Sequence, residues 1–158
     1  MELEIRPYQT SDAPALTGIF YRAVEALAGE CYSRQEVRAW APLPIAYAEW
    51  QSRLEHEQPW VAVLSHRPVG FISLQPVGLI GLAYVDPAFQ RRGVGRSLYA
   101  KLEREARARG IKRLHVEASH AAKPLFERMG YAVVERNMKR IGHTVLVNWL
   151  MQKPILPA

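Results

Sequence analysis

Two closely spaced glycines, set among arginines, are the residues of this sequence best suited to bind an anion. Gly93 and Gly95 begin a stretch whose apolar residues recur at helical spacing. Glycine lets the backbone approach a ligand closely, and the free N–H groups of a first helical turn attract negative charge. The arginines around the pair are Arg91, Arg92 and Arg96. This turn therefore favours the binding of a pyrophosphate.

The turn differs from two other phosphate-binding motifs. Gly93-x-Gly95 lacks the third glycine of a dinucleotide-binding fingerprint, and no acidic residue follows in the expected frame. The chain has no Gly-Lys dipeptide, which excludes a P-loop. The alternative to a pyrophosphate site is a solvated basic turn that does no more than begin a helix.

Length and composition are those of one globular domain. The chain has 158 residues, of which 49% are hydrophobic and 23% charged, and we expect a single domain over 1–158. The net charge of +6 favours anionic ligands. The longest run without a strongly polar residue, 77–85, is about half the ~18 residues that a membrane helix needs. The first residues do not read as a signal peptide, so we expect a cytoplasmic protein without membrane contact.

Metal chemistry is not indicated by the residue types. The single cysteine, Cys31, cannot form an intrachain disulfide or a Cys-rich zinc site. His115-x-Glu117 matches half of a zinc deaminase signature, but the paired cysteines are absent. We therefore expect no metal site.

The pattern of apolar and polar residues predicts the elements that must position the turn. The expected strands cover 3–5, 59–64, 69–75, 79–85, 114–118, 131–139 and 144–151. The expected helices run from N-cap candidates at 10–12 to Leu27, then over 33–40, 45–56, 93–109 and 121–129. This order indicates one α+β domain built on a mixed sheet.

Two stretches resemble the cofactor motifs of one family. Gln90-Arg-Arg-Gly93-Val-Gly95 resembles the Q/R-x-x-G-x-G/A signature of the GNAT N-acetyltransferase superfamily, and a strand ending in Val85-Asp86-Pro87 precedes it as that family requires. The stretch 117–131 resembles its second motif, from a strand end through a short helix to Gly-Tyr. The element order matches over essentially the whole chain. More narrowly, 32–42 and 148–153 resemble a branch of small bacterial single-domain acetyltransferases.

The resemblance implies a fold and an activity. The fold would be a central mixed, mostly antiparallel sheet that is splayed between its fourth and fifth strands and flanked by helices. Acetyl-CoA would bind across the splay as co-substrate. Its acetyl group would pass to an amine or hydroxylamine-like nitrogen of a small-molecule acceptor, by direct attack in a ternary complex. A homodimer is left open.

The resemblance also assigns residues to the cofactor. The backbone amides over 91–97 would hold the pyrophosphate, Val85 would pair with the pantetheine arm, and Ser119 and Phe126 would line the thioester end. Lys123 is either a further phosphate ligand or a solvated helix lysine. The expected cofactor-binding set is Val85, Gln90, Arg91, Arg92, Gly93, Val94, Gly95, Arg96, Ser97, Ser119 and Phe126.

The acid and base that many family members use are missing here. Counting back from Val85 in strict alternation along the fourth strand gives Ala83, Gly81 and Leu79, which include no carboxylate. The position of the usual tyrosine is Phe126. A thiol leaves readily near neutral pH, so the missing acid costs little. Because no base is present, we expect direct attack by an amine that is already neutral.

Substitute residues must come from elsewhere. The catalytic candidates are Ser119 and Glu117, which alternate on the strand beside the splay, although a solvated strand face explains such a pattern as well. The candidates on the acceptor side are Tyr32, Glu36 and Gly81. Eight of the 15 aromatic residues precede residue 61, which favours an apolar or aromatic amine.

Two other function classes remain as alternatives. A non-catalytic acyl-CoA sensor would explain the empty acid and base positions. A nucleic-acid-binding module would explain a basic cluster at 104–113, but no RNA-binding signature accompanies it and the aromatics lie elsewhere.

Overall fold

The computed structural model describes residues 2–156, which form one seven-stranded sheet with helices on both faces. The strands are β1 (Leu3–Pro7), β2 (Trp60–Leu64), β3 (Arg67–Leu74), β4 (Leu79–Val85), β5 (Arg113–Ala118), β6 (Ala132–Ile141) and β7 (Thr144–Pro154). The helices are α1 (Ala13–Glu25), α2 (Arg34–Trp40), α3 (Tyr47–Glu57), α4 (Val94–Ala108) and α5 (Lys123–Arg128), with short 3₁₀ turns η1 (Thr10–Asp12) and η2 (Pro87–Phe89).

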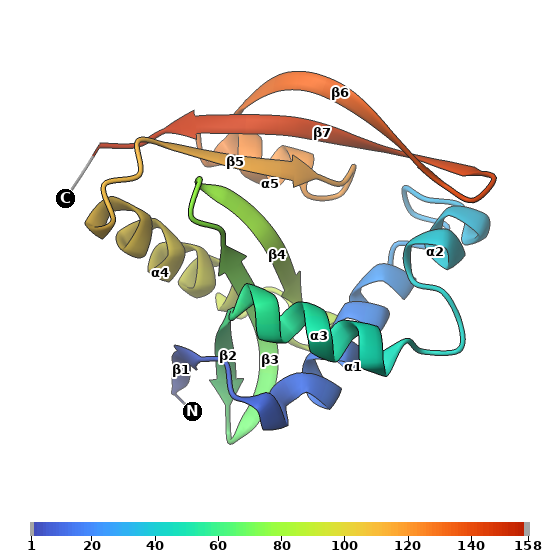
Figure 1. The fold of residues 1–158 in the computed structure, drawn as a ribbon, viewed down its shortest axis with the longest axis horizontal. Helices are drawn as coiled ribbons and strands as arrows, with labels where there is room; N and C mark the ends of the chain where they lie inside the picture. The colour runs from blue at the N-terminus through green and yellow to red at the C-terminus, as the bar shows by residue number, and fades with distance from the viewer. Residues whose placement is uncertain (1, 157–158) are drawn as a thin grey trace.

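The sheet confirms the expected mixed, mostly antiparallel fold. Its strand order is β1-β2-β3-β4-β5-β7-β6, and among these pairs β4 and β5 alone run parallel. The parallel pair is short, because it joins Leu79 to His115 and Ile80 to Val116 and extends no further. Figure 1 shows β5, β7 and β6 diverging from β1–β4 beyond that point. The sheet is therefore splayed between its fourth and fifth strands, as expected.

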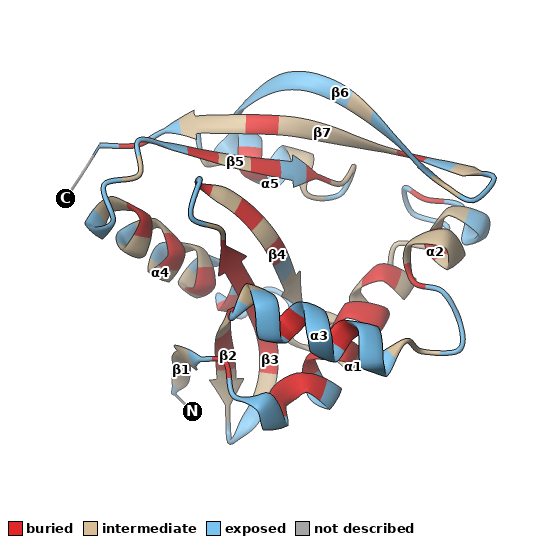
Figure 2. Ribbon diagram, in the orientation of Figure 1, coloured by how far each residue is buried: buried red, intermediate tan, exposed pale blue. Residues whose placement is uncertain are grey.

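Two cores hold the layers together. One lies between the sheet and helices α1 and α3, and it contains Phe20, Trp50 and Leu54. The other lies between the sheet and helices α4 and α5, and it contains Leu98 and Leu102. Figure 2 shows the buried residues of α4 as bands on its strand-facing side. Both faces of the sheet are thus covered, and the splay opens between the two halves.

Helix α4 forms where the sequence pattern predicts it. Its buried residues recur every four positions, so one stripe packs on the sheet: Val94, Leu98, Leu102 and Ala106. Gly93 precedes the helix with φ +79°, and Gly110 follows it with φ +74°. Both are left-handed conformations that glycine adopts without steric cost. The two glycines therefore fix where the helix begins and ends.

Strict alternation along β4 is wrong, because the strand contains a β-bulge. Ile72 of β3 lies opposite Ala83, but Leu74 lies opposite Ile80, so three steps of β4 match two of β3. Below the bulge the faces are exchanged: Leu82 belongs to the α1–α3 core, whereas Ile80 belongs to the α4–α5 core. Gly81 consequently faces α3, and it does not share a face with Val85.

Candidate active site

The turn before α4 presents its amides to open space. The first hydrogen bond of the helix runs from Ser97 N to Gly93 O over 2.9 Å. The preceding N–H groups, those of Val94, Gly95 and Arg96, therefore have no partner within the helix. No atom lies within 4 Å of the point where a Cβ at Gly93 would sit. A diphosphate could approach this backbone without displacing a side chain.

Exposed cations surround these amides. Arg91, Arg92 and Arg96 are all exposed, as is Gln90. The guanidinium groups of Arg92 and Arg67 each lie 5.4 Å from the centre of the Phe89 ring, which adds Arg67 to the cluster. Val94 differs from these neighbours, because its side chain is buried and only its backbone is left to contact a ligand. The local charge suits an anionic ligand.

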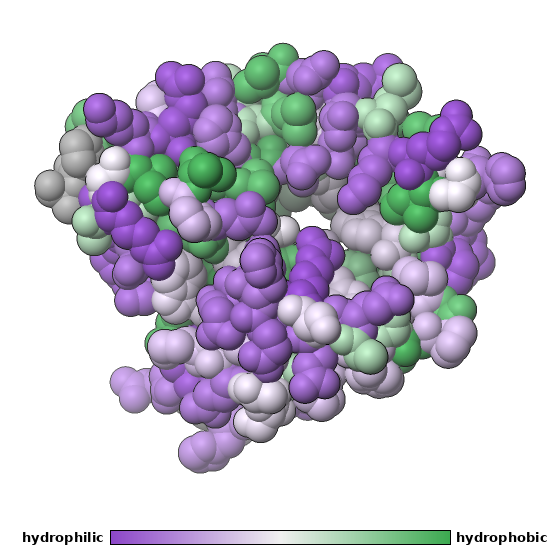
Figure 3. All heavy atoms as spheres, in the orientation of Figure 1, coloured by the Kyte–Doolittle hydropathy of each residue, from purple (hydrophilic) through white to green (hydrophobic). Residues whose placement is uncertain are grey.

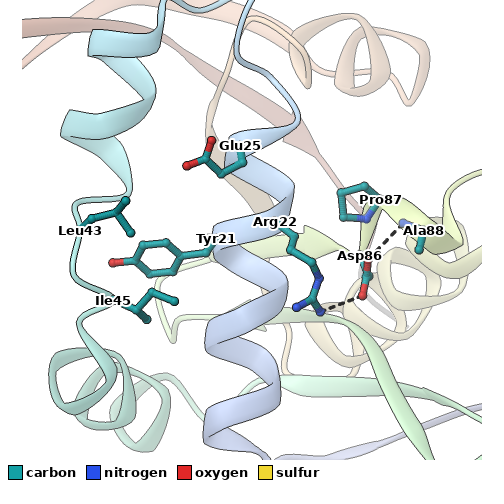
Figure 4. A pocket seen from close by; sticks show the side chains of 8 residues that line it. All are labelled: Tyr21, Arg22, Glu25, Leu43, Ile45, Asp86, Pro87 and Ala88. Atoms are coloured by element: carbon teal, nitrogen blue, oxygen red, sulfur yellow. Dashed lines mark hydrogen bonds and ion pairs between the residues drawn. The ribbon is translucent and has the colours of Figure 1, made fainter.

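A buried ion pair connects α1 to the loop before this turn. Asp86 is 1% exposed and accepts hydrogen bonds from Arg22 Nη2 at 2.9 Å and from the Ala88 amide at 3.1 Å. Burial alone would raise the pKa of Asp86, but these two hydrogen bonds, together with the positive charges of Arg22 and Arg67, outweigh it and lower the pKa below its ordinary value. Figure 4 shows Arg22 reaching from α1 to Asp86 at the edge of a cavity of about 530 Å³ that Tyr21 and Leu43 also line.

A second cavity, of about 400 Å³, lies on the α3 side of the splay, and we call it the acceptor cleft. It contains residues from both halves of the sheet, among them Gly81 of β4 and Glu117 of β5. Figure 3 shows an opening in this face of the molecule, between the regions that Figure 1 labels β7 and α3. The aromatic residues lining the cleft are Phe20, Tyr21, Tyr32, Trp40, Trp50 and Tyr84. The charged residues lining it are Glu49, Arg53, Glu117 and Lys139.

The two catalytic candidates, Glu117 and Ser119, both line the acceptor cleft. Glu117 is exposed there. Ser119 Oγ accepts a hydrogen bond from the Ala122 amide at 3.1 Å, which leaves its hydroxyl hydrogen free to be donated. Phe126 lies deeper, at 7% exposure, and packs edge-on against Tyr131 with ring centres 5.0 Å apart.

The acceptor-side candidates divide between the cleft and the framework. Tyr32 and Gly81 line the cleft. The Tyr32 hydroxyl accepts from the His120 amide at 2.9 Å and donates to the Val147 carbonyl at 3.3 Å, so it joins three segments around the splay. Burial is the main reason that the pKa of Tyr32 is raised. Glu36 instead caps α2 by accepting from the Ser33 amide at 2.8 Å, and it is not among the lining residues of the cleft.

Sequence reasoning missed Glu57, the last residue of α3. Its carboxylate lies directly against Gly81. It accepts one hydrogen bond from Ser73 of β3 and another from Gln75, the residue that follows β3. The available signal was the spacing of Trp50, Leu54 and Glu57, which places all three on the buried face of a helix. Its position over β4 depends on the bulge and could not be read from that spacing.

Two kinds of feature are absent from residues 2–156. No helix there is long and apolar enough to cross a membrane. No three histidine, cysteine, aspartate or glutamate side chains gather there in a way that could hold a metal ion.

Known proteins resemble this chain over most of its length. The family model described as "Acetyltransferase (GNAT) domain" matches residues 29–147. The "Uncharacterized N-acetyltransferase YafP" of Escherichia coli (strain K12) is 37% identical over 150 residues, which are 95% of each chain. The "Glucosamine 6-phosphate N-acetyltransferase" of Trypanosoma brucei brucei is 29% identical over 91 residues, covering 49% of this chain and 62% of that one.

Solved structures show the same fold. A GCN5-related N-acetyltransferase from Rhodopseudomonas palustris has a TM-score of 0.91 and 35% identity, covering 98% of this chain and 97% of that one. At 21% identity, the putative acetyltransferase yncA of Salmonella typhimurium, solved with acetyl-CoA, has a TM-score of 0.70 and covers 98% and 94% of the two chains.

Proposed function

The chain belongs to the GNAT acetyltransferase family and is an N-acetyltransferase, and from this premise we propose its reaction. The acetyl group of acetyl-CoA passes to the nitrogen of a small-molecule amine or hydroxylamine-like acceptor. The acceptor attacks directly, in a ternary complex, and residues 1–158 act as one catalytic domain.

One observation carries the cofactor assignment: the open amides at the start of α4 lie within a cluster of exposed arginines. A Cβ at Gly93 would meet nothing within 4 Å, and one at Gly95 would meet Val85 Cγ2 at 3.7 Å, so the backbone is free to contact a diphosphate. In this proposal the amides over 91–97 hold the pyrophosphate, assisted by Gln90 and the arginines. Val85, Ser119 and Phe126 are assigned to the pantetheine and thioester end.

The acceptor cleft determines what can be acetylated. Its aromatic walls favour an acceptor with an apolar or aromatic body, because such surfaces gain from burial. Glu117 favours an acceptor with a cationic ammonium, and the Ser119 hydroxyl is placed to donate a hydrogen bond at the reacting end. When bound, acetyl-CoA supplies a thioester whose carbonyl carbon is the electrophile.

A CoA-release screen tests this proposal. The purified protein is supplied with acetyl-CoA and with alkylamines, arylamines, hydroxylamines, aminoglycosides or peptides, and free thiol is measured over time. We expect steady release with at least one small amine that has an aromatic or apolar body. Saturable acetyl-CoA binding without release by any acceptor would instead support an acyl-CoA sensor.

A further inference from the structure

We propose that Glu57 is the general base of the transfer reaction: its carboxylate, held over Gly81 by α3, accepts the proton of the acceptor nitrogen. This inference rests on the proposed function. It assigns a base to a site whose strand β4, with the sequence Leu-Ile-Gly-Leu-Ala-Tyr-Val, provides no carboxylate. The expectation that a neutral amine attacks without a base is therefore the competing outcome.

The carboxylate occupies the space of an absent β4 side chain. A Cβ at Gly81 would overlap Glu57 Oε1 and would lie 3.1 Å from Gln75 Nε2. Gly81 is not among the residues with positive φ, so its backbone conformation would accept a side chain. The Glu57 carboxylate thus occupies the space into which a side chain at position 81 of β4 would project.

Two donors hold this carboxylate in one orientation. Ser73 Oγ donates to Glu57 Oε1 at 2.6 Å, and Gln75 Nε2 donates to Oε2 at 3.0 Å. Ser73 is fully buried, and its Oγ also accepts from the Leu82 amide at 2.9 Å within the bulge. These bonds make Ser73 and Gln75 positioning residues, and they tie the carboxylate to the irregular segment of β4.

The immediate neighbours of Glu57 line the acceptor cleft. Gly81 lies beneath its carboxylate, Arg53 lies one turn earlier on α3, and both belong to the cleft lining. Glu57 itself is half-buried and is not among the lining residues, so the proton reaches its carboxylate from the cleft past Gly81, most simply through one water. The charged residues that line the cleft are Glu49 and Arg53 of α3, Glu117 of β5 and Lys139 of β6, and its tyrosines are Tyr21, Tyr32 and Tyr84.

Helix stability does not explain an acid at this position. Glu57 is the last residue of α3, where the partial negative charge of the helix end disfavours a carboxylate. A neutral glutamine would still anchor this segment, because its Oε1 can accept from Ser73 and the Gln75 amide can turn its oxygen to accept from the new Nε2. A role in proton transfer requires the charge.

The step that Glu57 performs balances as follows. One proton leaves the acceptor ammonium for the Glu57 carboxylate, directly or through one water. The freed nitrogen lone pair forms the N–C bond to the acetyl carbon. The C–S bond breaks, and its electron pair leaves with the CoA sulfur. After the attack the nitrogen still carries one excess proton, which passes to the departing sulfur, so CoA leaves as a thiol and the product is a neutral amide.

The test compares Glu57→Gln with Glu55→Gln and Glu117→Gln in the CoA-release assay across pH, with two acceptors of different basicity. Glu55 is a matched control, because it is also a glutamate of α3 outside the cleft lining, but its carboxylate accepts a hydrogen bond from the Tyr8 hydroxyl, whereas that of Glu57 lies against Gly81. We expect Glu57→Gln to lower kcat by about 10²-fold with little change in KM. Wild type should show one inflection in kcat/KM that stays at the same pH for both acceptors, and Glu57→Gln should remove it.

A relocated carboxylate provides a rescue. Glu57→Ala clears the space over Gly81, so the double variant Glu57→Ala, Gly81→Glu should regain activity over Glu57→Ala alone. CoA affinity measured by calorimetry checks that each variant is folded. The proposal is overturned if folded Glu57→Gln keeps wild-type kcat, if it raises KM alone, or if Glu117→Gln removes the inflection. Wild-type turnover in the same assay tests acetyl transfer itself, so the two claims fail separately.

Discussion

At the scale of single residues, the charges around the α4 turn act mainly through long-range attraction. The guanidinium of Arg92 lies 5.4 Å from the Phe89 ring. Because Arg92 is exposed, dissolved salt screens its charge. We expect Arg92→Ala to weaken CoA binding by roughly threefold at low salt and by less at high salt.

Arg104→Ala is the matched control for this prediction. Arg104 is also exposed on α4, but it lies in the C-terminal half of the helix, away from the turn. Its substitution removes the same charge from the molecule. Calorimetric titrations with CoA at two salt concentrations make the comparison. Equal losses for both variants would mean that net charge, and not the position of Arg92, governs affinity.

Residues also show where sequence reasoning ends. The glycines at 93 and 95 and their arginines were found because their types and spacing belong to one continuous turn. Glu57 was not found, because its role depends on three segments: α3, the residues Ser73 and Gln75, and a bulge in β4. Glu36 was proposed for the substrate from its place in the chain, whereas its carboxylate caps α2.

At the scale of elements, the ion pair between Arg22 and Asp86 fastens α1 to the loop that leads into α4. Replacing Asp86 by asparagine keeps the size of the side chain, but it removes the charge and one of the two acceptor oxygens that Arg22 and the Ala88 amide contact. We expect Asp86→Asn to lower the free energy of unfolding by roughly 1–3 kcal/mol at pH 7.

The pH dependence of this loss follows from the lowered pKa of Asp86. The folded pKa lies below the ordinary value of 3.8, so the stabilisation is present above about pH 4 and disappears as the pH falls through the folded pKa. Urea unfolding at several pH values measures it. Glu127→Gln, which removes an exposed pair with Lys123, is the control and should change stability by a few tenths of a kcal/mol. A difference between wild type and Asp86→Asn that stays constant down to pH 2 would contradict this account.

Elements with a regular pattern were predicted well, and irregular ones were not. The α4 stripe and its two glycines gave that helix within one or two residues. The β4 bulge was missed, because an extra residue in a strand leaves no mark in a run as uniformly apolar as 79–85. The error placed Gly81 on the same face as Val85 and so concealed the carboxylate above Gly81.

At the scale of the whole molecule, the splay brings two halves of the sheet together around one site. The turn before α4 belongs to the first half, and Glu117 and Ser119 belong to the second. The sequence alone indicated an α+β domain, while the splay itself was expected from the family resemblance. The splay could not be predicted from the residue pattern, because pairing between distant strands, such as β5 with β7, has no local sequence signature.

The central claim is that acetyl-CoA binds at the amides of the α4 turn, and calorimetric titration with CoA tests it most directly. Wild type should bind CoA saturably, and Gly93→Val should bind at least about tenfold more weakly, because a side chain would stand between the diphosphate and the amides.

Gly110→Val is the matched control: it has the same left-handed strain and open surroundings, at the other end of α4. It should bind within about twofold of wild type if the strain alone has no effect on the site. A folded Gly93→Val protein that binds CoA as tightly as Gly110→Val does would contradict the account.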